Sequence, residues 1–397
     1  MLTAVTPNAR LTGKVKSLQM LCGFVCFLVL ASNVWSMSHW NEARGVYDDV
    51  CYLRQAHLFQ RFGLGRFDTD MSKDDDHYLA SKLKEIGYPT WNDSATAPCH
   101  TPMPASGRLV LQYPPGTGLM LALFPQGHQV IPLYVTVSVI LFGFALLGIF
   151  SARVASSVVL AGAVGCLAIY LMINPSKASY SMAPTMAACA IAGYLTARLP
   201  SSALPSRRAS MAILLGLVLG LSVNFRLPNL FLSSGYVLYF LGTFLSSRKL
   251  RDFMLGFCFG AAFLAGMAPT LLSNAINAGS PLATTYGGPD VTPPDFSFGI
   301  IRQYMTDLQF GLLLLAGVWT ARIFLLHREN GVRRIALVVA ADLLVNLAFF
   351  MSHPVFTPYY TVPIAMLSLW TLLFASLMRP SEAVHCGPGE QAASARS

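Results

Sequence analysis

Residues 17–36 read SLQMLCGFVCFLVLASNVWS, and the polar stretch NEARGVYDDVCYLRQAHLFQRFG follows at 41–63. The first stretch is apolar over about 20 residues, the length at which a helix crosses the hydrocarbon core of a bilayer. It is too long for an ordinary signal sequence and no small-x-small cleavage site follows it, so we expect a retained transmembrane helix. The second stretch places two adjacent acids, Asp48 and Asp49, just outside that span.

The whole chain has the composition of a membrane protein. Of its 397 residues, 54% are hydrophobic and only 11% are charged, whereas soluble domains carry about 25% charged residues. Apolar segments of about the length of a span occur near residues 17–36, 130–151, 154–173, 180–197, 210–225, 228–245, 253–275, 308–325, 335–351 and 359–378. The sequence therefore predicts an all-α polytopic membrane protein with about ten transmembrane helices.

Lysine and arginine gather on one side of the predicted membrane. The 16 of 27 that fall in alternate connections and at the two ends are Arg10, Lys14, Lys16, Arg153, Arg198, Arg207, Arg208, Arg248, Lys249, Arg251, Arg322, Arg328, Arg333, Arg334, Arg379 and Arg396. Because cytoplasmic loops are enriched in these residues, we predict that both termini are cytoplasmic and that the acidic pair faces outward. The net charge of +9 then reflects membrane topology rather than a nucleic-acid groove.

The predicted spans also divide the chain into parts. A cytoplasmic N-terminus at 1–16 precedes a transmembrane domain at 17–378, which includes a large outer loop at 37–129 between the first two spans. The small polar residues of the tail at 379–397 predict a disordered cytoplasmic end.

The acidic pair opens a predicted juxtamembrane helix of the outer loop. Residues 41–63 lack proline and mix apolar with polar positions as an amphipathic interfacial helix does. On such a helix Asp48 and Tyr52 are one turn apart, while Asp49 is offset by about 100°. One acid can then point at a cavity while the other is solvated or caps the helix. The alternative is an acidic helix start that the helix dipole favours.

Three other features of the outer loop bear on its chemistry. A disulfide between Cys51 and Cys99 is expected if the loop faces an oxidising compartment. The DTD sequence at 68–70 resembles the DxD of metal-dependent sugar-nucleotide enzymes, but it lacks their α/β domain, so we predict a solvated loop. We expect the DDD run at 74–76 to face solvent too.

A short apolar stretch closes the outer loop. YPPG at 113–116 leads into it, and it ends by Phe124 and Pro125. Because it is too short to cross a bilayer, we predict a re-entrant or surface helix whose N-terminal amides are open to an anionic headgroup.

The order of these motifs resembles that of the GT-C glycosyltransferases, which include protein O-mannosyltransferases and lipid A aminoarabinose transferases. The stretches that carry the resemblance are DDVCYLRQA at 48–56, YPPG at 113–116, GLVLG at 216–220, NFRLP at 224–228, NAINAGSPL at 274–282 with Tyr286, and HPVFTPYY at 353–360. The last stretch lies where relatives often carry R-Y-x-x-P, and here the arginine is absent.

The resemblance implies an enzyme that moves a sugar from a polyprenyl-phosphate donor to a glycan, lipid or protein acceptor, at the outer face of a bacterial inner membrane. Asp48 matches the family's acid, which takes the proton of the acceptor, and Asp49 replaces its glutamate. Both are predicted to be catalytic, and which one is the base stays open. No metal ligand is predicted, but a divalent cation at the acidic pair also stays open.

Release of the donor phosphate requires cations at the same face. Arginine suits bidentate phosphate binding, and Pro228 should break the helix beside Arg226. The predicted substrate-binding residues are Tyr52, Tyr113, Lys177, Arg226, Tyr286, Arg302 and His353.

Two other functions compete with the enzyme. A transporter or flippase of lipid-linked sugars would use the same outer cations without chemistry, and a non-catalytic relative would only bind polyprenyl lipids. A transporter should line a membrane path with charges. Asp342 is the only acid deep in a predicted span, and we expect it to make an interhelical hydrogen bond.

Overall fold

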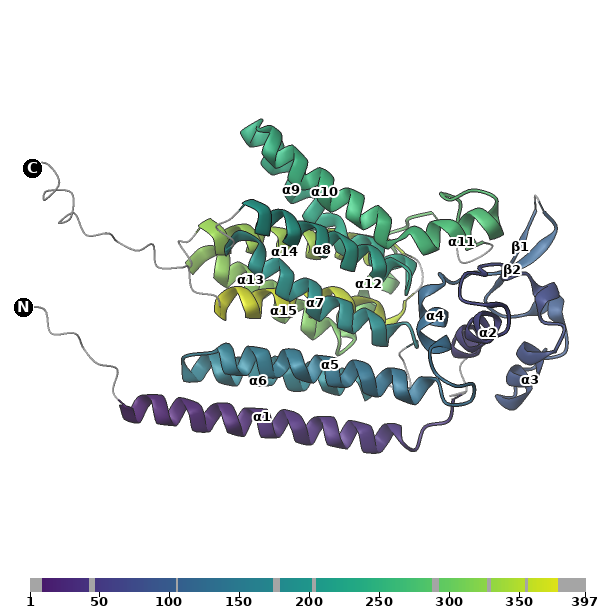
Figure 1. Ribbon diagram of the computed structural model, residues 1–397, viewed down its shortest axis with the longest axis horizontal. Coiled ribbons are helices and arrows are strands. Elements are labelled where there is room, and N and C mark those ends of the chain that lie inside the picture. Colours follow the sequence, from purple (N-terminus) through teal and green to yellow (C-terminus); the bar gives the residue numbers. More distant parts are fainter. Residues whose placement is uncertain are drawn as a thin grey trace, which may run out of the picture.

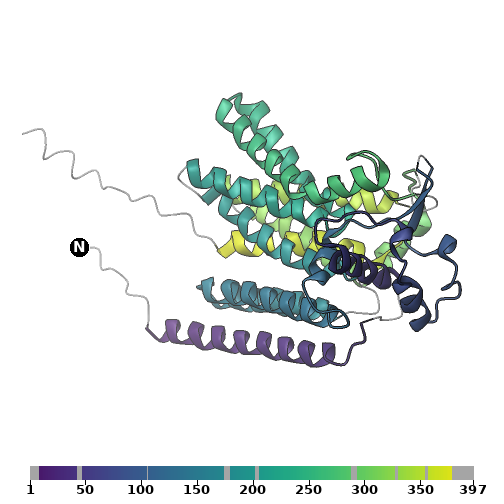
Figure 2. The ribbon, with the colours of Figure 1, turned by 45° about the vertical axis from the view of Figure 1, so that its right-hand side comes forward.

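The computed structural model describes residues 9–42, 47–104, 106–173, 179–201, 205–287, 293–326, 330–353 and 356–377, and these ranges are mainly helical. Most of the helices run side by side in one bundle, while α2, α3, α4 and a small hairpin gather at one of its ends (Figure 1). Both views show the start of α1 and the end of α15 at the opposite end (Figure 2).

The bundle contains most of the long apolar helices. Its elements are α1 (Ala9–Met37), α5 (Val130–Ser151), α6 (Ala155–Tyr170), η3 (Leu171–Ile173), α7 (Met182–Ser201), α8 (Pro205–Val223), η4 (Leu227–Ser233), α9 (Ser234–Ser247), α10 (Leu250–Gly266), α11 (Ala268–Ala278), α12 (Phe298–Thr306), α13 (Phe310–Leu326), α14 (Asn330–Ser352), η6 (Pro358–Thr361) and α15 (Val362–Leu377).

Seven helical segments in the described ranges are long and apolar enough to cross a membrane, and the number is nine if each of two bent helix pairs is one span. This confirms a polytopic α-helical membrane protein. Helices occupy all ten predicted ranges. The one predicted span that is not among these nine is α7. It is twenty residues long but contains Pro184, Thr185 and Arg198, so the number ten stays a prediction.

One predicted span is broken. The segment expected at 253–275 is divided between α10 and α11, which meet at Met267 with a bend of 50°. Pro269 stands at the start of α11 and cannot donate a backbone hydrogen bond to the preceding turn. The range predicted as one helix therefore contains two, and the pair together is still long and apolar enough for one span.

α15 is the central helix of the bundle. All but two of its sixteen residues are buried, and the Trp370 side chain is fully covered. A helix that is apolar all round needs protein on every side. Gly193 lets α7 approach, because a Cβ there would lie 2.7 Å from the Cβ of Trp370.

Glycines bring other helices equally close. A Cβ at Gly220 of α8 would lie 2.1 Å from the carbonyl oxygen of Phe263 in α10, and one at Gly216 would lie 2.3 Å from that of Phe259. The GLVLG stretch is thus a close-packing face of the kind that joins membrane helices.

Asp342 makes the interhelical contact that the sequence predicted. Its Oδ1 accepts a hydrogen bond from the backbone N–H of Gly235. A Cβ at Gly235 would lie 2.3 Å from the carbonyl oxygen of Val338, so this glycine lets α9 touch α14.

The segment between α1 and α5 forms a small folded unit on the end of the bundle. It contains α2 (Tyr47–Phe62), η1 (Met71–Lys73), α3 (Tyr78–Glu85), η2 (Ser94–Thr96), β1 (His100–Met103), β2 (Arg108–Leu111) and α4 (Gly116–Ala122). The strands pair antiparallel, with His100 opposite Leu111. This hairpin was not expected in an all-α chain, because four-residue strands leave little periodicity to detect.

The glycine contact predicts a stability difference. Gly220→Ala forces α8 and α10 apart, so we expect a loss of about 2 kcal/mol or more from overpacking. Gly260→Ala in α10 is the matched control, because nothing lies within 4 Å of its added Cβ. Thermal unfolding in detergent measures both, and equal melting temperatures for the two variants would contradict the packing described here.

Candidate functional site

The acidic pair lies in the first turn of α2, where the helix dipole favours negative charge. The two side chains point in different directions, as their 100° offset requires. Asp49 is fully buried, whereas Asp48 is half-buried.

Asp49 ties α2 to the bundle. Its Oδ1 accepts a hydrogen bond of 3.2 Å from the backbone N–H of Tyr180, which lies two residues before the start of α7. A carboxylate without water is costly unless it is hydrogen-bonded. The contact therefore holds the first turn of α2 against the entry to α7.

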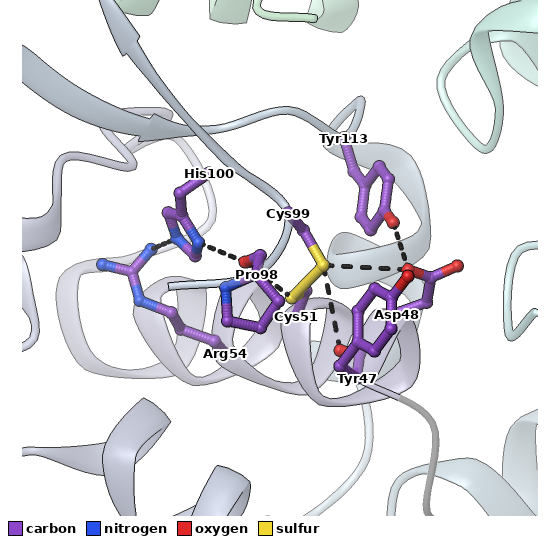
Figure 3. The surroundings of a disulfide bond; sticks show 8 residues. All are labelled: Tyr47, Asp48, Cys51, Arg54, Pro98, Cys99, His100 and Tyr113. Carbon is purple, nitrogen blue, oxygen red and sulfur yellow. Dashed lines mark hydrogen bonds between the residues drawn. A yellow bond between two sulfur atoms is a disulfide. The ribbon is translucent and has the colours of Figure 1, made fainter. Parts of the chain in front are cut away.

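Asp48 faces a group of tyrosines. The hydroxyl of Tyr113 donates a 2.6 Å hydrogen bond to its Oδ1 (Figure 3). The ring of Tyr113 stacks on that of Tyr52, with centroids 4.6 Å apart, and lies 6.3 Å from that of Tyr286. Three of the predicted substrate-binding residues thus lie together beside Asp48.

Arg226 lies beyond the end of α8, as the adjacent Pro228 predicted. Its backbone is extended, and η4 begins at the next residue. The side chain is only 7% exposed, and its guanidinium lies 5.0 Å from the ring centre of Tyr359 and 4.8 Å from that of Tyr360. Such cation–π contacts hold a cation in a dry site while its planar face is covered.

Asp48 and Arg226 act on the same tyrosine hydroxyls. Burial raises the pKa of Tyr52, the charge of Asp48 raises it further, and the charge of Arg226 lowers it. Burial also raises the pKa of Tyr286, and the same two charges act on it with the same opposite signs. The acid and the cation therefore both lie near one group of tyrosines, which we call the tyrosine cluster: Tyr52, Tyr113, Tyr286, Tyr359 and Tyr360.

Asn224 connects the elements that carry the acid and the cation. Its carbonyl oxygen accepts a 2.7 Å hydrogen bond from the N–H of Gly116 at the start of α4. Its side-chain amide donates to the carbonyl of Gly266, and its side-chain oxygen accepts from Thr270. A Cβ at Gly116 would lie 2.7 Å from Asn224, so the glycine of YPPG is needed for this close approach.

This arrangement corrects the prediction that the first amides of the short helix are open to a headgroup. The N–H of Gly116 is already used by Asn224, and α4 has only seven residues. The short helix itself is confirmed at Gly116–Ala122. Its role is to join α2 to the end of α8.

The other predicted cations lie apart from these contacts or outside the described residues. Lys177 falls outside the ranges that the structure describes. Arg302 is exposed on α12. His353 stacks on Phe349, with ring centres 5.9 Å apart.

Sequence reasoning missed Tyr359 and Tyr360. The stretch HPVFTPYY lacks the arginine of R-Y-x-x-P, and for that reason its tyrosines were not predicted to belong to the site. It supplies the two rings that contact Arg226. Two adjacent tyrosines after a proline, at the start of an apolar span, were the available signal.

Cys51 and Cys99 form a disulfide, as expected. It pins α2 to the strand that begins at His100 (Figure 3). On the next turn of α2, the fully buried Arg54 donates to the carbonyl oxygens of Thr69 (3.1 Å) and Asp70 (3.0 Å). The covalent and polar contacts together support the helix that carries Asp48.

The expectation that both acidic runs are solvated is wrong in part. Asp68 and Asp70 bind Arg108, and Asp74 is buried beside Arg54, 3.4 Å from its Nε. Asp75 does stay largely exposed. In the described ranges, no group of three His, Cys, Asp or Glu side chains is arranged to hold a metal ion.

Comparisons with known proteins give no further guidance. The chain matches no protein-family model, and searches of curated proteins and of solved structures return no match.

His100 predicts a pH dependence of stability. Its Nδ1 donates to the carbonyl oxygen of Pro98 and its Nε2 accepts from Arg54, so the ring is neutral. Burial and the charge of Arg54 lower the pKa of His100 to about 3. The unfolded chain, with an ordinary pKa of about 6.5, binds a proton that the folded chain does not. Stability should therefore fall as the pH falls below about 6.5.

From about pH 7.5 to about pH 5.5 this single group should cost about 1.4 kcal/mol. Melting temperatures at the two pH values measure the loss in the wild type and in His100→Gln, in which the loss should shrink. His128→Gln, at an exposed position, should keep the wild-type slope. An unchanged slope in His100→Gln would show that His100 is not the titrating group.

Proposed function

We propose that this protein is an integral-membrane glycosyltransferase of GT-C type that uses a polyprenyl-phosphate sugar as donor. The observation that carries the proposal is that the half-buried carboxylate of Asp48 and the buried guanidinium of Arg226 both contact tyrosines of one cluster. An acid to take a proton and a cation to stabilise a departing phosphate are the two groups that this transfer needs.

The proposed reaction follows from these two groups. Asp48 accepts the proton of an acceptor hydroxyl or amine while the acceptor atom forms a bond to the anomeric carbon of the sugar. The bond from that carbon to the phosphate oxygen breaks, and polyprenyl phosphate leaves with the electron pair. Arg226 stabilises the phosphate through its guanidinium N–H groups, and the hydroxyl of Tyr113 orients the Asp48 carboxylate.

Asp49 is a positioning residue in this mechanism. Its carboxylate is bonded to the backbone of Tyr180 and has no exposed surface. The burial of Asp49 supports Asp48 as the base.

We further propose ten membrane crossings, with the site outward. The start of α1 and the end of α15 lie on the same side of the bundle (Figure 1), so the number of crossings should be even, and α7 provides the tenth. The lysine and arginine distribution favours a cytoplasmic location for that side. The Cys51–Cys99 disulfide favours an oxidising compartment for the other.

Carboxylate variants test the base. Purified protein is incubated with a panel of polyprenyl-phosphate monosaccharides and a membrane extract as acceptor source, and released polyprenyl phosphate is measured. We expect Asp48→Asn to lower the rate by about 100-fold or more. Asp49→Asn should cost less, because an amide oxygen still accepts from Tyr180. Glu85→Gln, an exposed carboxylate of the same segment, is the control.

Two outcomes would contradict the enzyme. Full activity in Asp48→Asn would remove Asp48 as the base. Movement of the donor across a vesicle membrane without release of polyprenyl phosphate would identify a transporter instead.

Arginine variants test the phosphate site. Arg226→Gln should lower kcat/KM by about 100-fold, comparable to the loss of one transition-state donor. Arg226→Lys should recover part of the rate, because a lysine keeps the charge but not the bidentate geometry. Arg302→Gln should have a smaller effect, since that side chain is exposed on α12. A larger effect at Arg302 would move the phosphate site to α12.

A further inference from the structure

A slot between α9 and α14 opens at the end of the bundle away from Asp48. The two helices touch where Gly235 meets Asp342. From there a cavity of about 820 Å³ follows both helices, lined by Leu238, Gly242 and Ser246 of α9 and by Ala341, Leu337 and Arg334 of α14. Both views show the α9–α10 pair leaning away from the bundle at this end (Figures 1 and 2).

The slot has the length of a lipid chain. It runs from Gly235 to Ser246, and eleven residues of helix rise about 16 Å. Its inner wall is apolar, with Leu238 and Leu337 each about half exposed. Nothing lies within 4 Å of a Cβ placed on Gly242, so the glycine opens the slot instead of packing two helices.

The mouth of the slot is cationic. Arg208, Lys249, Arg251 and Arg334 line it together with one acid, Asp252. That acid already accepts a 2.6 Å hydrogen bond from the hydroxyl of Ser247, and Arg251 stays 68% exposed at 3.9 Å from it. Among the lining residues that the structure describes, four positive charges against one negative charge leave an excess of three at the mouth.

We propose that this slot binds an anionic phospholipid, with one acyl chain between α9 and α14 and the headgroup phosphate at the four cations. Basic pockets between membrane helices at the cytoplasmic side are suited to anionic headgroups. A zwitterionic lipid would bring its own cation into a mouth that already has an excess of positive charge. The polyprenyl donor is not the expected occupant, because Asp48 and Arg226 lie at the opposite end. The proposal does not depend on the proposed function.

The slot also explains how a splayed helix pair is held. α9 and α10 have many exposed apolar side chains at this end, such as Leu241, Leu245 and Phe257. A bound acyl chain fills the wedge beside α9, and the phosphate connects cations on α8, α10 and α14. Lipid binding should therefore raise the thermal stability of the protein.

Lipid titration of the full chain tests the proposal. Delipidated protein in detergent is titrated with phosphatidylglycerol, phosphatidylcholine or glycerol phosphate, and bound lipid is counted by native mass spectrometry alongside the melting temperature. We expect phosphatidylglycerol to bind and to stabilise the protein, and phosphatidylcholine to bind at least about tenfold more weakly. Glycerol phosphate alone should not stabilise it, because it lacks the acyl chain.

Matched variants locate the site. Arg251→Gln with Arg334→Gln should weaken phosphatidylglycerol binding by about tenfold or more, as expected for two lost charge-assisted contacts. Arg207→Gln with Arg333→Gln removes the same charge from neighbouring positions that do not line the slot, and binding should be unchanged. Equal loss in the two pairs would show only a general electrostatic attraction and would overturn the site.

A slot-filling variant tests the acyl chain. Gly242→Leu should weaken binding without lowering the melting temperature of the lipid-free protein, because its side chain enters open space. Gly260→Leu is the control, since it also meets nothing within 4 Å but lies outside the slot. Unchanged binding in Gly242→Leu, or equal binding of phosphatidylcholine and phosphatidylglycerol, would overturn the proposal.

Discussion

The hydrogen bond from the backbone of Tyr180 to the buried carboxylate of Asp49 is the contact on which the site geometry depends. Burying a charged group costs free energy unless the group is hydrogen-bonded or paired inside the protein. A rotation of α2 would break this hydrogen bond inside the protein. Because Asp48 precedes it in the same turn, the direction of Asp48 is constrained too, and its carboxylate accepts the hydrogen bond of Tyr113.

The cation is positioned by a second, independent set of contacts. Gly216 and Gly220 let α8 pack against the backbone of α10. This packing determines the position of the end of α8, and with it the position of Arg226 three residues later. Asn224 then joins that end to α4 and to α11. Acid and cation thus belong to parts of the chain that are far apart in sequence but meet through backbone contacts, which are stiff and directional.

The sequence was informative where one physical property dominates. Span length and hydropathy predicted helices at all ten ranges, and Pro228 correctly predicted that the helix breaks before Arg226. The bend at Met267 was missed because a single Pro269 hardly changes the hydropathy of its surroundings. Asp74 was misjudged because its burial depends on Arg54, twenty residues earlier in the chain.

The tyrosine cluster was predictable only in part, for a similar reason. Tyr52, Tyr113 and Tyr286 belong to recognisable motifs, but Tyr359 and Tyr360 come from the far end of the chain. Which of two adjacent acids is buried depends on the rotation of α2 against α7, and periodicity alone does not determine that angle.

The most direct measurement is an experimental structure with polyprenyl monophosphate bound. The account predicts a phosphate oxygen about 3 Å from the guanidinium of Arg226, beside the tyrosine cluster and on the same side of the bundle as Asp48. A phosphate held at the cation-lined slot between α9 and α14, or on α12 with Arg226 still covered by Tyr359 and Tyr360, would contradict it.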